Sequence, residues 1–254
     1  MRRLAILGAL AACGNVSTPL DAAGPDADLL GALRTGCVVM EHMDEAAWTG
    51  AVGEVRDDCG GDNNGTVIGG ITTTDDSVRG RAGNFDGNGF IEIPTATALD
   101  ASTELTISAW FKATALDDVD AFGIVSKRTD TGIDQAYSMY LWTRDKVWVD
   151  FPDQNQRFEG SAVISNNVWT QVTAVYDASA GSTMRVTVYL DGVVDSTDTD
   201  TVTTLPKSPA KLNIGAMPSS LAIQNFKGQL DEVVVWTRAL TDVEVMSWYN
   251  VTKP

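Results

Sequence analysis

Histidine is the scarcest of the residues that could carry out chemistry in this chain, because His42 is the only one among 254 residues. A catalytic site of the Ser-His-Asp or Cys-His type would have to be built on it. The residues around His42 form no nucleophile motif, and we expect its side chain to lie on a strand and face solvent. The sequence therefore indicates a protein that is not an enzyme.

Carboxylates are abundant, but their pattern does not suit glycoside hydrolysis. A glycosidase needs two carboxyl groups about 5–10 Å apart in a cleft. Asp231 and Glu232 are adjacent within a run of strand-forming residues, so we expect their side chains to point to opposite faces of the strand. A degenerate glycoside hydrolase is therefore only the third function that we consider.

Aromatic residues recur in YSMYLWTRDKVWVDF, residues 137–151, where side chains alternate as in two-faced strands. Only a turn with an odd number of residues puts both apolar sets on one face. We take residues 143–145 as that turn. The resulting register places Trp142 opposite Lys146, Leu141 opposite Val147 and Tyr140 opposite Trp148.

This register predicts a ligand surface. Tyr140, Trp142 and Trp148 share the face of the sheet that points away from the core, near Asp150. Flat aromatic rings with hydrogen-bonding groups beside them suit sugar rings, whose C–H faces stack on π systems. These four residues are therefore predicted to bind a glycan. The alternative is that another loop or the second layer of the fold covers the rings.

Short segments rich in β-branched and aromatic residues recur along the chain, separated by Gly, Asp, Asn and Pro. They predict an all-β fold, an antiparallel two-sheet β-sandwich with a short helix near the C-terminus. Asp191-Gly192 suits a two-residue hairpin turn, and Thr241 with Glu244 suits a capping box. The expected strands are 90–93, 105–111, 124–127, 137–143, 147–151, 170–176, 185–190, 211–214 and 230–236.

The N-terminus predicts export and lipid anchoring. Arg2 and Arg3 precede a short apolar run, and Leu10-Ala11-Ala12-Cys13 matches the bacterial lipobox, whose cysteine is acylated and becomes the mature N-terminus. Residues 1–12 are then a signal peptide, and Gly14 favours the outer membrane or cell surface within the bacterial cell envelope. The alternatives are an ordinary cleaved signal with a chance cysteine, or a start codon placed too late.

Composition and charge fit a domain on a tether. Residues 13–35 are small, polar and contain two prolines, as is typical of a flexible linker, and residues 36–254 suffice for one β-sandwich with its core. The net charge of −16 repels phosphate backbones and so disfavours nucleic acid as a partner. No other apolar run approaches the roughly 18 residues of a transmembrane helix.

Of the three cysteines, Cys37 and Cys59 remain once Cys13 carries the lipid. An even pair in an oxidising compartment usually bonds. The bridge would close a loop of about 22 residues and stabilise the fold by roughly 3 kcal/mol on the chain-entropy model. The alternative is two free, buried thiols.

Eight blocks of sequence follow one another in a recognisable order. They are GCVVMEHMDE, DDCGGDNNGTV, GRAGNFDGNGFIEIP, LTISAWFKA, WTQVTAVYD, MRVTVYLDGVV, LNIGA and FKGQLDEVVVWTRALTDVE. Together they resemble the LamG-like jelly roll family, within the concanavalin A-like lectin and glucanase superfamily. The resemblance covers nearly all of residues 36–249, and it implies a jelly roll that serves for binding.

The resemblance also implies a metal. Jelly rolls of this superfamily often hold a structural Ca²⁺ where the opening segment and the closing strand meet, and Ca²⁺ takes six to eight oxygen ligands. The ligands implied here are Asp44, Asp62, Asn64 and Asp231. The alternative is that these residues only form turns and solvated surface.

Hydrolases of the same superfamily carry an E-x-D-x-x-E motif on one strand, and Glu41, Asp44 and Glu45 do not have that spacing. We therefore expect a non-catalytic carbohydrate- or glycan-binding module, displayed on the cell envelope by its lipid anchor at Cys13. The alternative is a structural or adhesive lipoprotein that binds another protein.

Overall fold

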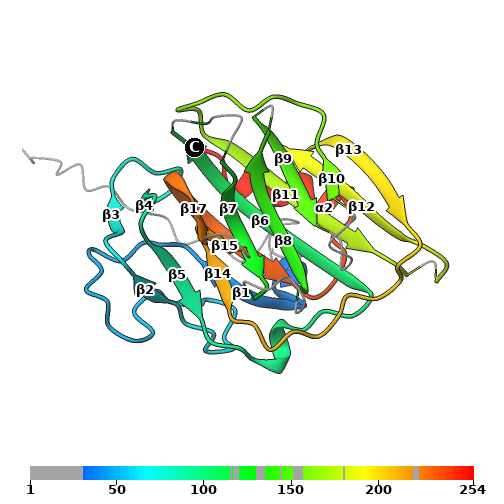
Figure 1. Ribbon diagram of the computed structural model, residues 1–254, viewed down its shortest axis with the longest axis horizontal. Coiled ribbons are helices and arrows are strands. Elements are labelled where there is room, and N and C mark those ends of the chain that lie inside the picture. Colours follow the sequence, from blue (N-terminus) through cyan, green and yellow to red (C-terminus); the bar gives the residue numbers. More distant parts are fainter. Residues whose placement is uncertain are drawn as a thin grey trace, which may run out of the picture.

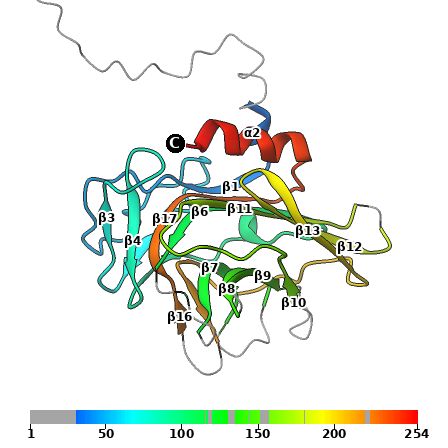
Figure 2. The same ribbon diagram turned by 90° about the horizontal axis from the view of Figure 1, so that it is seen from above.

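The computed structural model describes residues 31–114, 116, 120–129, 135–143, 145–150, 157–179, 181–219 and 223–254. In them the chain forms two antiparallel sheets packed face to face, with helix α2 (Asp242–Thr252) against the outer face of the first (Figure 1 and Figure 2). The predicted all-β, two-sheet sandwich with a short helix near the C-terminus is confirmed. Residues 1–12, Cys13 and most of the tether predicted at 13–35 lie outside the described residues.

The first sheet has eight strands, of which β1 pairs with β17 and the others follow the order β13-β12-β11-β6-β17-β4-β3. Their bounds are β1 (Cys37–Glu41), β3 (Thr72–Thr74), β4 (Ala82–Asp86), β6 (Glu104–Ala113), β11 (Thr170–Asp177), β12 (Met184–Leu190), β13 (Val193–Asp200) and β17 (Lys227–Trp236).

The second sheet has seven strands in the order β10-β9-β8-β7-β14-β5-β2. They are β2 (Thr66–Ile68), β5 (Phe90–Ile93), β7 (Phe122–Lys127), β8 (Tyr137–Trp142), β9 (Lys146–Asp150), β10 (Arg157–Glu159) and β14 (Leu212–Ile214). A 3-10 turn spans Thr97–Leu99, and β15 (Ala216–Pro218) pairs with β16 (Ile223–Asn225) in a separate two-stranded sheet.

The main core lies between the two large sheets and follows from the alternation of their strands. Side chains one residue apart point to opposite faces, and every second residue of β6 and β8 belongs to this core. The inward set includes Leu105, Ile107, Ala109 and Phe111 of β6, with Tyr137, Met139 and Leu141 of β8.

A second apolar cluster joins α2 to the outer face of the first sheet (Figure 2). The rings of Trp236 in β17 and Trp248 in α2 meet edge to face, with centroids 5.6 Å apart. On β6, Trp110 stacks on Tyr249 of α2 at 5.7 Å and donates its indole N–H to Thr252. Because the helix covers this face, the outward residues of β6 are buried as well.

The last residues of the predicted tether belong to the folded domain. Leu33 is 2% exposed, and its carbonyl accepts a hydrogen bond from the Trp236 indole at 2.6 Å. Arg238 donates to the carbonyls of Ala32 and Thr35. The predicted boundary at residue 36 is therefore too late, because the small, polar composition of 13–35 conceals Leu33 as an apolar contact.

Three local predictions are confirmed. Asp191 and Gly192 both have positive φ, 50° and 76°, in the turn between β12 and β13. Thr241 and Glu244 form a reciprocal capping box at the start of α2. Cys37 and Cys59 form a disulfide with their Cα atoms 5.6 Å apart. Among the described residues, no helix is both long and apolar enough to cross a membrane.

Candidate functional site

Strands β8, β9 and β10 place aromatic and charged side chains on the outer face of the second sheet. The register of β8 and β9 is the predicted one. Strand β10 extends the same face beyond β9. The residues that pair across neighbouring strands are Trp142 with Lys146, Leu141 with Val147, Tyr140 with Trp148, Asp150 with Arg157, and Trp148 with Glu159. Of these, Leu141 and Val147 point into the core.

Trp142 and Trp148 form the accessible aromatic part of this face. Their rings meet edge to face, with centroids 5.4 Å apart and an interplanar angle of 61°, and both side chains are half-buried. The Trp148 indole donates to the carbonyl of Thr143 at 3.5 Å. The pair therefore offers an aromatic corner to a ligand, rather than the flat platform of three rings that the register suggested.

Tyr140 lies on the same face, as predicted, but it is only 1% exposed. It packs in a small cluster with Ala121 and Met217. Met217 belongs to β15, whose two-stranded sheet covers this part of β7 and β8. The expectation that Tyr140 is open to a ligand is therefore wrong, and the alternative that another segment covers the ring is correct for this residue.

Asp150 is also buried, at 2% exposed. Its Oδ1 accepts a hydrogen bond from the Tyr140 hydroxyl at 2.7 Å, and its Oδ2 accepts one from Nη1 of Arg128 at 3.1 Å. Burial raises the pKa of Asp150, and burial next to Asp150 raises the pKa of the Tyr140 hydroxyl. Asp150 thus holds neighbouring side chains in place and does not face a ligand directly.

Arg157 is the residue of this face that the sequence did not reveal. Its Nε lies 3.8 Å from Oδ1 of Asp150, and its side chain is 42% exposed. Its guanidinium carbon lies 5.0 Å from the centroid of the Trp142 ring, within the range of a cation–π contact. The beginning of β10 could not be read from the sequence, because a three-residue strand shows no alternation.

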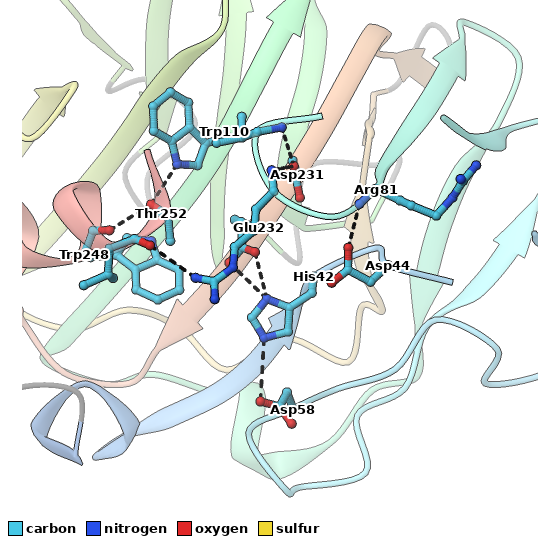
Figure 3. A network of polar contacts seen from close by, with 12 residues as sticks. His42, Asp44, Asp58, Arg81, Trp110, Asp231, Glu232, Trp248 and Thr252 are labelled. Atoms are coloured by element: carbon cyan, nitrogen blue, oxygen red, sulfur yellow. Dashed lines mark hydrogen bonds and ion pairs between the residues drawn. The ribbon is translucent and has the colours of Figure 1, made fainter. Parts of the chain in front are cut away.

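The four residues predicted to bind calcium form two pairs, of which Asp44 and Asp231 hydrogen-bond to one loop and Asp62 and Asn64 lie in another. Asp44 Oδ1 accepts from the backbone N–H of Arg81 at 2.7 Å, and Asp231 Oδ2 accepts from those of Val78 and Arg79 (Figure 3). These two carboxylates therefore bind one loop, residues 78–81. Asp231 is fully buried, and burial raises its pKa to about 8.

The other two predicted ligands lie in the loop after Cys59. Asp62 is exposed, and the Asn64 side-chain oxygen accepts from the backbone N–H of Asp57 at 3.0 Å. The described residues contain no group of three or more His, Cys, Asp or Glu side chains that could hold a metal. The predicted set of four ligands does not fit one ion, and calcium itself stays a prediction.

His42 lies just after β1 and not on a strand, and its side chain is 34% exposed. Figure 3 shows it between two carboxylates: its Nδ1 lies 3.0 Å from Oε1 of Glu232 and its Nε2 lies 3.6 Å from Asp58. The hydrogen bond with Glu232 raises the pKa of His42. Glu232 has a φ of 49° where the pairing of β17 with β6 is irregular, and this bulge buries its carboxylate against β1.

A separate hollow of about 540 Å³ lies where α2 begins, on the outer face of the first sheet. Arg185 forms an ion pair with Asp177 at 3.2 Å there, and the Tyr189 hydroxyl donates to Asp242 at 2.7 Å. These four polar side chains are thus already paired with one another. Tyr189 is 4% exposed, so the hollow offers no open aromatic ring, and we regard it as the weaker candidate.

The comparisons with known proteins agree with the jelly-roll fold. A family model described as the concanavalin A-like lectin/glucanases superfamily matches residues 85–246. No curated protein matches the sequence. Among solved structures, domain 4 of an extracellular arabinanase from Geobacillus stearothermophilus, in complex with arabinotriose, is 19% identical with a TM-score of 0.60. The alignment covers 84% of this chain and 98% of that domain.

Two toxin structures are also similar. The binding domain of Paraclostridial Mosquitocidal Protein 1 is 16% identical with a TM-score of 0.63, and the alignment covers 86% of this chain. A botulinum neurotoxin type C structure, described as dependent on two ganglioside molecules for cell entry, is 11% identical with a TM-score of 0.63, and the alignment covers 89% of this chain. This chain spans only 53% of either toxin chain. At these identities, the likeness shows the fold alone.

Proposed function

The chain belongs to the concanavalin A-like lectin/glucanases superfamily, and on this premise we propose that it is a non-catalytic module that binds glycans. The observation that carries the proposal is the half-buried, edge-to-face pair of Trp142 and Trp148 on the outer face of the second sheet. An aromatic ring that keeps part of its face in solvent can stack on the C–H face of a sugar.

The rest of this face supports the same proposal. Sugars need hydrogen-bonding groups beside the apolar contact, and Lys146, Arg157 and Glu159 lie beside the two rings. The structural neighbour that is in complex with arabinotriose is a domain of similar fold with a sugar ligand. We infer the ligand class of this chain by analogy with it.

The lack of catalysis is part of the proposal and rests on how the acid and base groups are used. The His42 ring is engaged by the Glu232 carboxylate. Asp150 is buried among Tyr140 and Arg128. These arrangements hold the His42 ring and the Asp150 carboxylate in fixed pairs, as in a structural network.

The proposed place of action is the bacterial cell envelope, through a lipid on Cys13. The support is the lipobox Leu10-Ala11-Ala12-Cys13 in the sequence. A protein partner in place of a glycan is the second candidate, since the two-stranded sheet of β15 and β16 reduces the aromatic surface by covering Tyr140.

A glycan array with the purified full-length chain tests the proposal. We expect binding to at least one oligosaccharide, and we expect Trp142→Ala and Trp148→Ala each to weaken it about tenfold or more, if each contact is worth about 1.4 kcal/mol. Trp169→Ala is the matched control, because Trp169 is also half-buried but lies beside Lys112 and Asp76. Binding that survives both substitutions, or no binding to any glycan, would refute the proposal.

A further inference from the structure

We propose that the glycan carries a carboxylate, as a uronic or sialic acid does, and that Arg157 binds this carboxylate while Trp142 and Trp148 contact the sugar ring. This inference rests on the proposed function and specifies its ligand class. It starts from an excess of positive charge at one point on a strongly acidic chain, whose net charge is −16.

Two guanidinium groups share a single buried carboxylate at this point. Arg128, which is 8% exposed, lies 3.1 Å from Oδ2 of Asp150. Arg157 lies on the open side and reaches the same carboxylate only through Nε, at 3.8 Å. Because Arg128 already neutralises Asp150 at hydrogen-bonding distance, Arg157 is not needed as its counter-ion.

The ion pair of Arg157 with Asp150 is also long. Its distance of 3.8 Å is at the long end for an ion pair, and the Arg157 side chain is 42% exposed, so solvent screens its charge. In the part of the chain that the structure describes, the Nη nitrogens of Arg157 have no hydrogen bond. Most of the donor capacity of this guanidinium therefore remains for a ligand.

Arg157 is nevertheless held in place. Its guanidinium lies over the Trp142 ring at 5.0 Å, and Asp150 positions its Nε. A planar guanidinium that is already fixed loses less conformational freedom when it binds. A carboxylate suits its fork of N–H groups, because two parallel hydrogen bonds form at once.

The neighbouring cation does not offer the same site. Lys146 forms an ion pair with Glu159 at 3.1 Å, so its charge is matched within the protein. An ammonium is also a point charge without the planar fork of arginine. The geometry therefore assigns the carboxylate of the glycan to Arg157 and not to Lys146.

The acidity of the whole chain opposes this ligand only weakly. At physiological ionic strength, charges more than about 8 Å apart are largely screened. A carboxylate in contact with Arg157 is attracted at short range, and acidic groups that lie beyond the screening length oppose it little. Raising the salt concentration should accordingly weaken binding, since the contact at Arg157 is itself partly exposed.

The test compares matched sugars. An array of oligosaccharides in pairs, each a uronic or sialic acid and its neutral methyl ester, is followed by calorimetric titration of the best pair. We expect the wild-type chain to bind the acid about tenfold more tightly than the ester. Arg157→Gln should abolish this preference, because it should weaken binding of the acid about tenfold more than binding of the ester. Arg157→Lys should retain a reduced preference, because the charge remains but the fork is lost.

Arg185→Gln is the matched control, because Arg185 is 59% exposed and paired with Asp177 on the first sheet, whereas the two tryptophans lie on the second. It should bind both sugars as the wild type does. Unchanged melting temperatures of all variants ensure that the comparison concerns binding.

Three outcomes would overturn the inference. Equal affinity of the wild type for acid and ester would do so and leave the glycan-binding function standing. Equal losses for acid and ester in Arg157→Gln would show that the arginine only supports Trp142. Sulfated sugars bound in preference to carboxylated ones would assign the site to a different anion. Binding to no sugar at all would instead refute the proposed function itself.

Discussion

At the scale of single residues, the structure buries a carboxyl group that the sequence did not mark as special. Glu41 ends strand β1 and is 0% exposed. Burial raises its pKa well above the usual value, and the nearby charges of Asp57 and Glu45 raise it further. Glu41 is therefore an acid that the fold prefers in its neutral form.

This preference predicts a pH-dependent stability. The unfolded chain releases the Glu41 proton near pH 4.3, whereas the folded chain retains it to higher pH. The contribution of Glu41 to the free energy of unfolding should therefore fall by about 1.4 kcal/mol per pH unit above pH 4.3 until the folded state also ionises. Glu41→Gln removes the ionisation, so the variant should become progressively more stable than the wild type between pH 5 and 7.

Urea denaturation at pH 5, 6 and 7 measures this difference. Asp198→Asn is the control for the loss of an exposed carboxylate, because Asp198 lies exposed on β13. If the difference between Glu41→Gln and the wild type were constant from pH 5 to 7, the folded pKa of Glu41 would not be raised.

At the scale of elements, the short helix depends on its cap. The Thr241 hydroxyl accepts from the Glu244 backbone N–H at 3.3 Å, and the Glu244 carboxylate accepts from the Thr241 backbone N–H at 2.9 Å. These bonds satisfy two N–H groups at the helix start. The cap matters because α2 covers the outer face of β6 and buries Trp248.

Removal of the cap should therefore destabilise the whole domain. We expect Thr241→Ala to lower the free energy of unfolding by about 1 kcal/mol. Ser247→Ala, in the middle of α2, is the control and should be neutral or slightly stabilising, because alanine is the better helix former. Denaturant unfolding measures both. Equal effects of the two substitutions would show that the cap adds nothing.

The elements also show how far the sequence could predict the site. Alternation in 137–151 predicted the pairing of β8 with β9 correctly. Successive side chains point to opposite faces, so a shift of one residue would have moved the apolar side chains out of the core. The burial of Tyr140 could not be predicted, because Met217, which packs on it, comes from a three-residue strand much later in the chain. Arg157 was missed for a similar reason, since β10 has only three residues.

At the scale of the whole molecule, the two ends of the domain meet at one loop. Asp44, just after β1, and Asp231, in β17, both accept hydrogen bonds from the backbone of residues 78–81. The resemblance to the jelly roll family implied that the opening segment and the closing strand would meet. The sequence could not predict that Asp62 and Asn64 would stay apart from them, because loop conformation leaves no periodic pattern.

Calcium is the prediction that belongs to this junction. A ligand that binds only the folded state stabilises it by RT ln(1 + [L]/Kd), which is about 2.7 kcal/mol at 100 times its Kd. We expect millimolar Ca²⁺ to raise the melting temperature above that in EDTA. Asp231→Asn should abolish the increase, whereas Asp62→Asn, in the other loop, should retain it. Identical melting curves with and without Ca²⁺, and no metal by elemental analysis, would contradict the prediction.

Attachment to the membrane is the last prediction, and it follows from charge as much as from the lipobox. A chain with a net charge of −16 is repelled by anionic lipid surfaces, so the domain should not adhere to a membrane without an anchor. Stable anchoring takes two or more acyl chains, which lipobox processing would attach at Cys13. We therefore expect the wild type in the membrane fraction of the producing bacterium, and Cys13→Ser in a soluble or uncleaved form.

The double variant Cys37→Ser/Cys59→Ser is the control for this fractionation. It removes the disulfide but keeps the lipobox, so it should stay in the membrane fraction even though it is less stable. Mass spectrometry of the N-terminal peptide should find acyl chains on Cys13 in the wild type and in this control. An unacylated Cys13, together with the same fractionation of wild type and Cys13→Ser, would contradict the prediction of a lipid anchor.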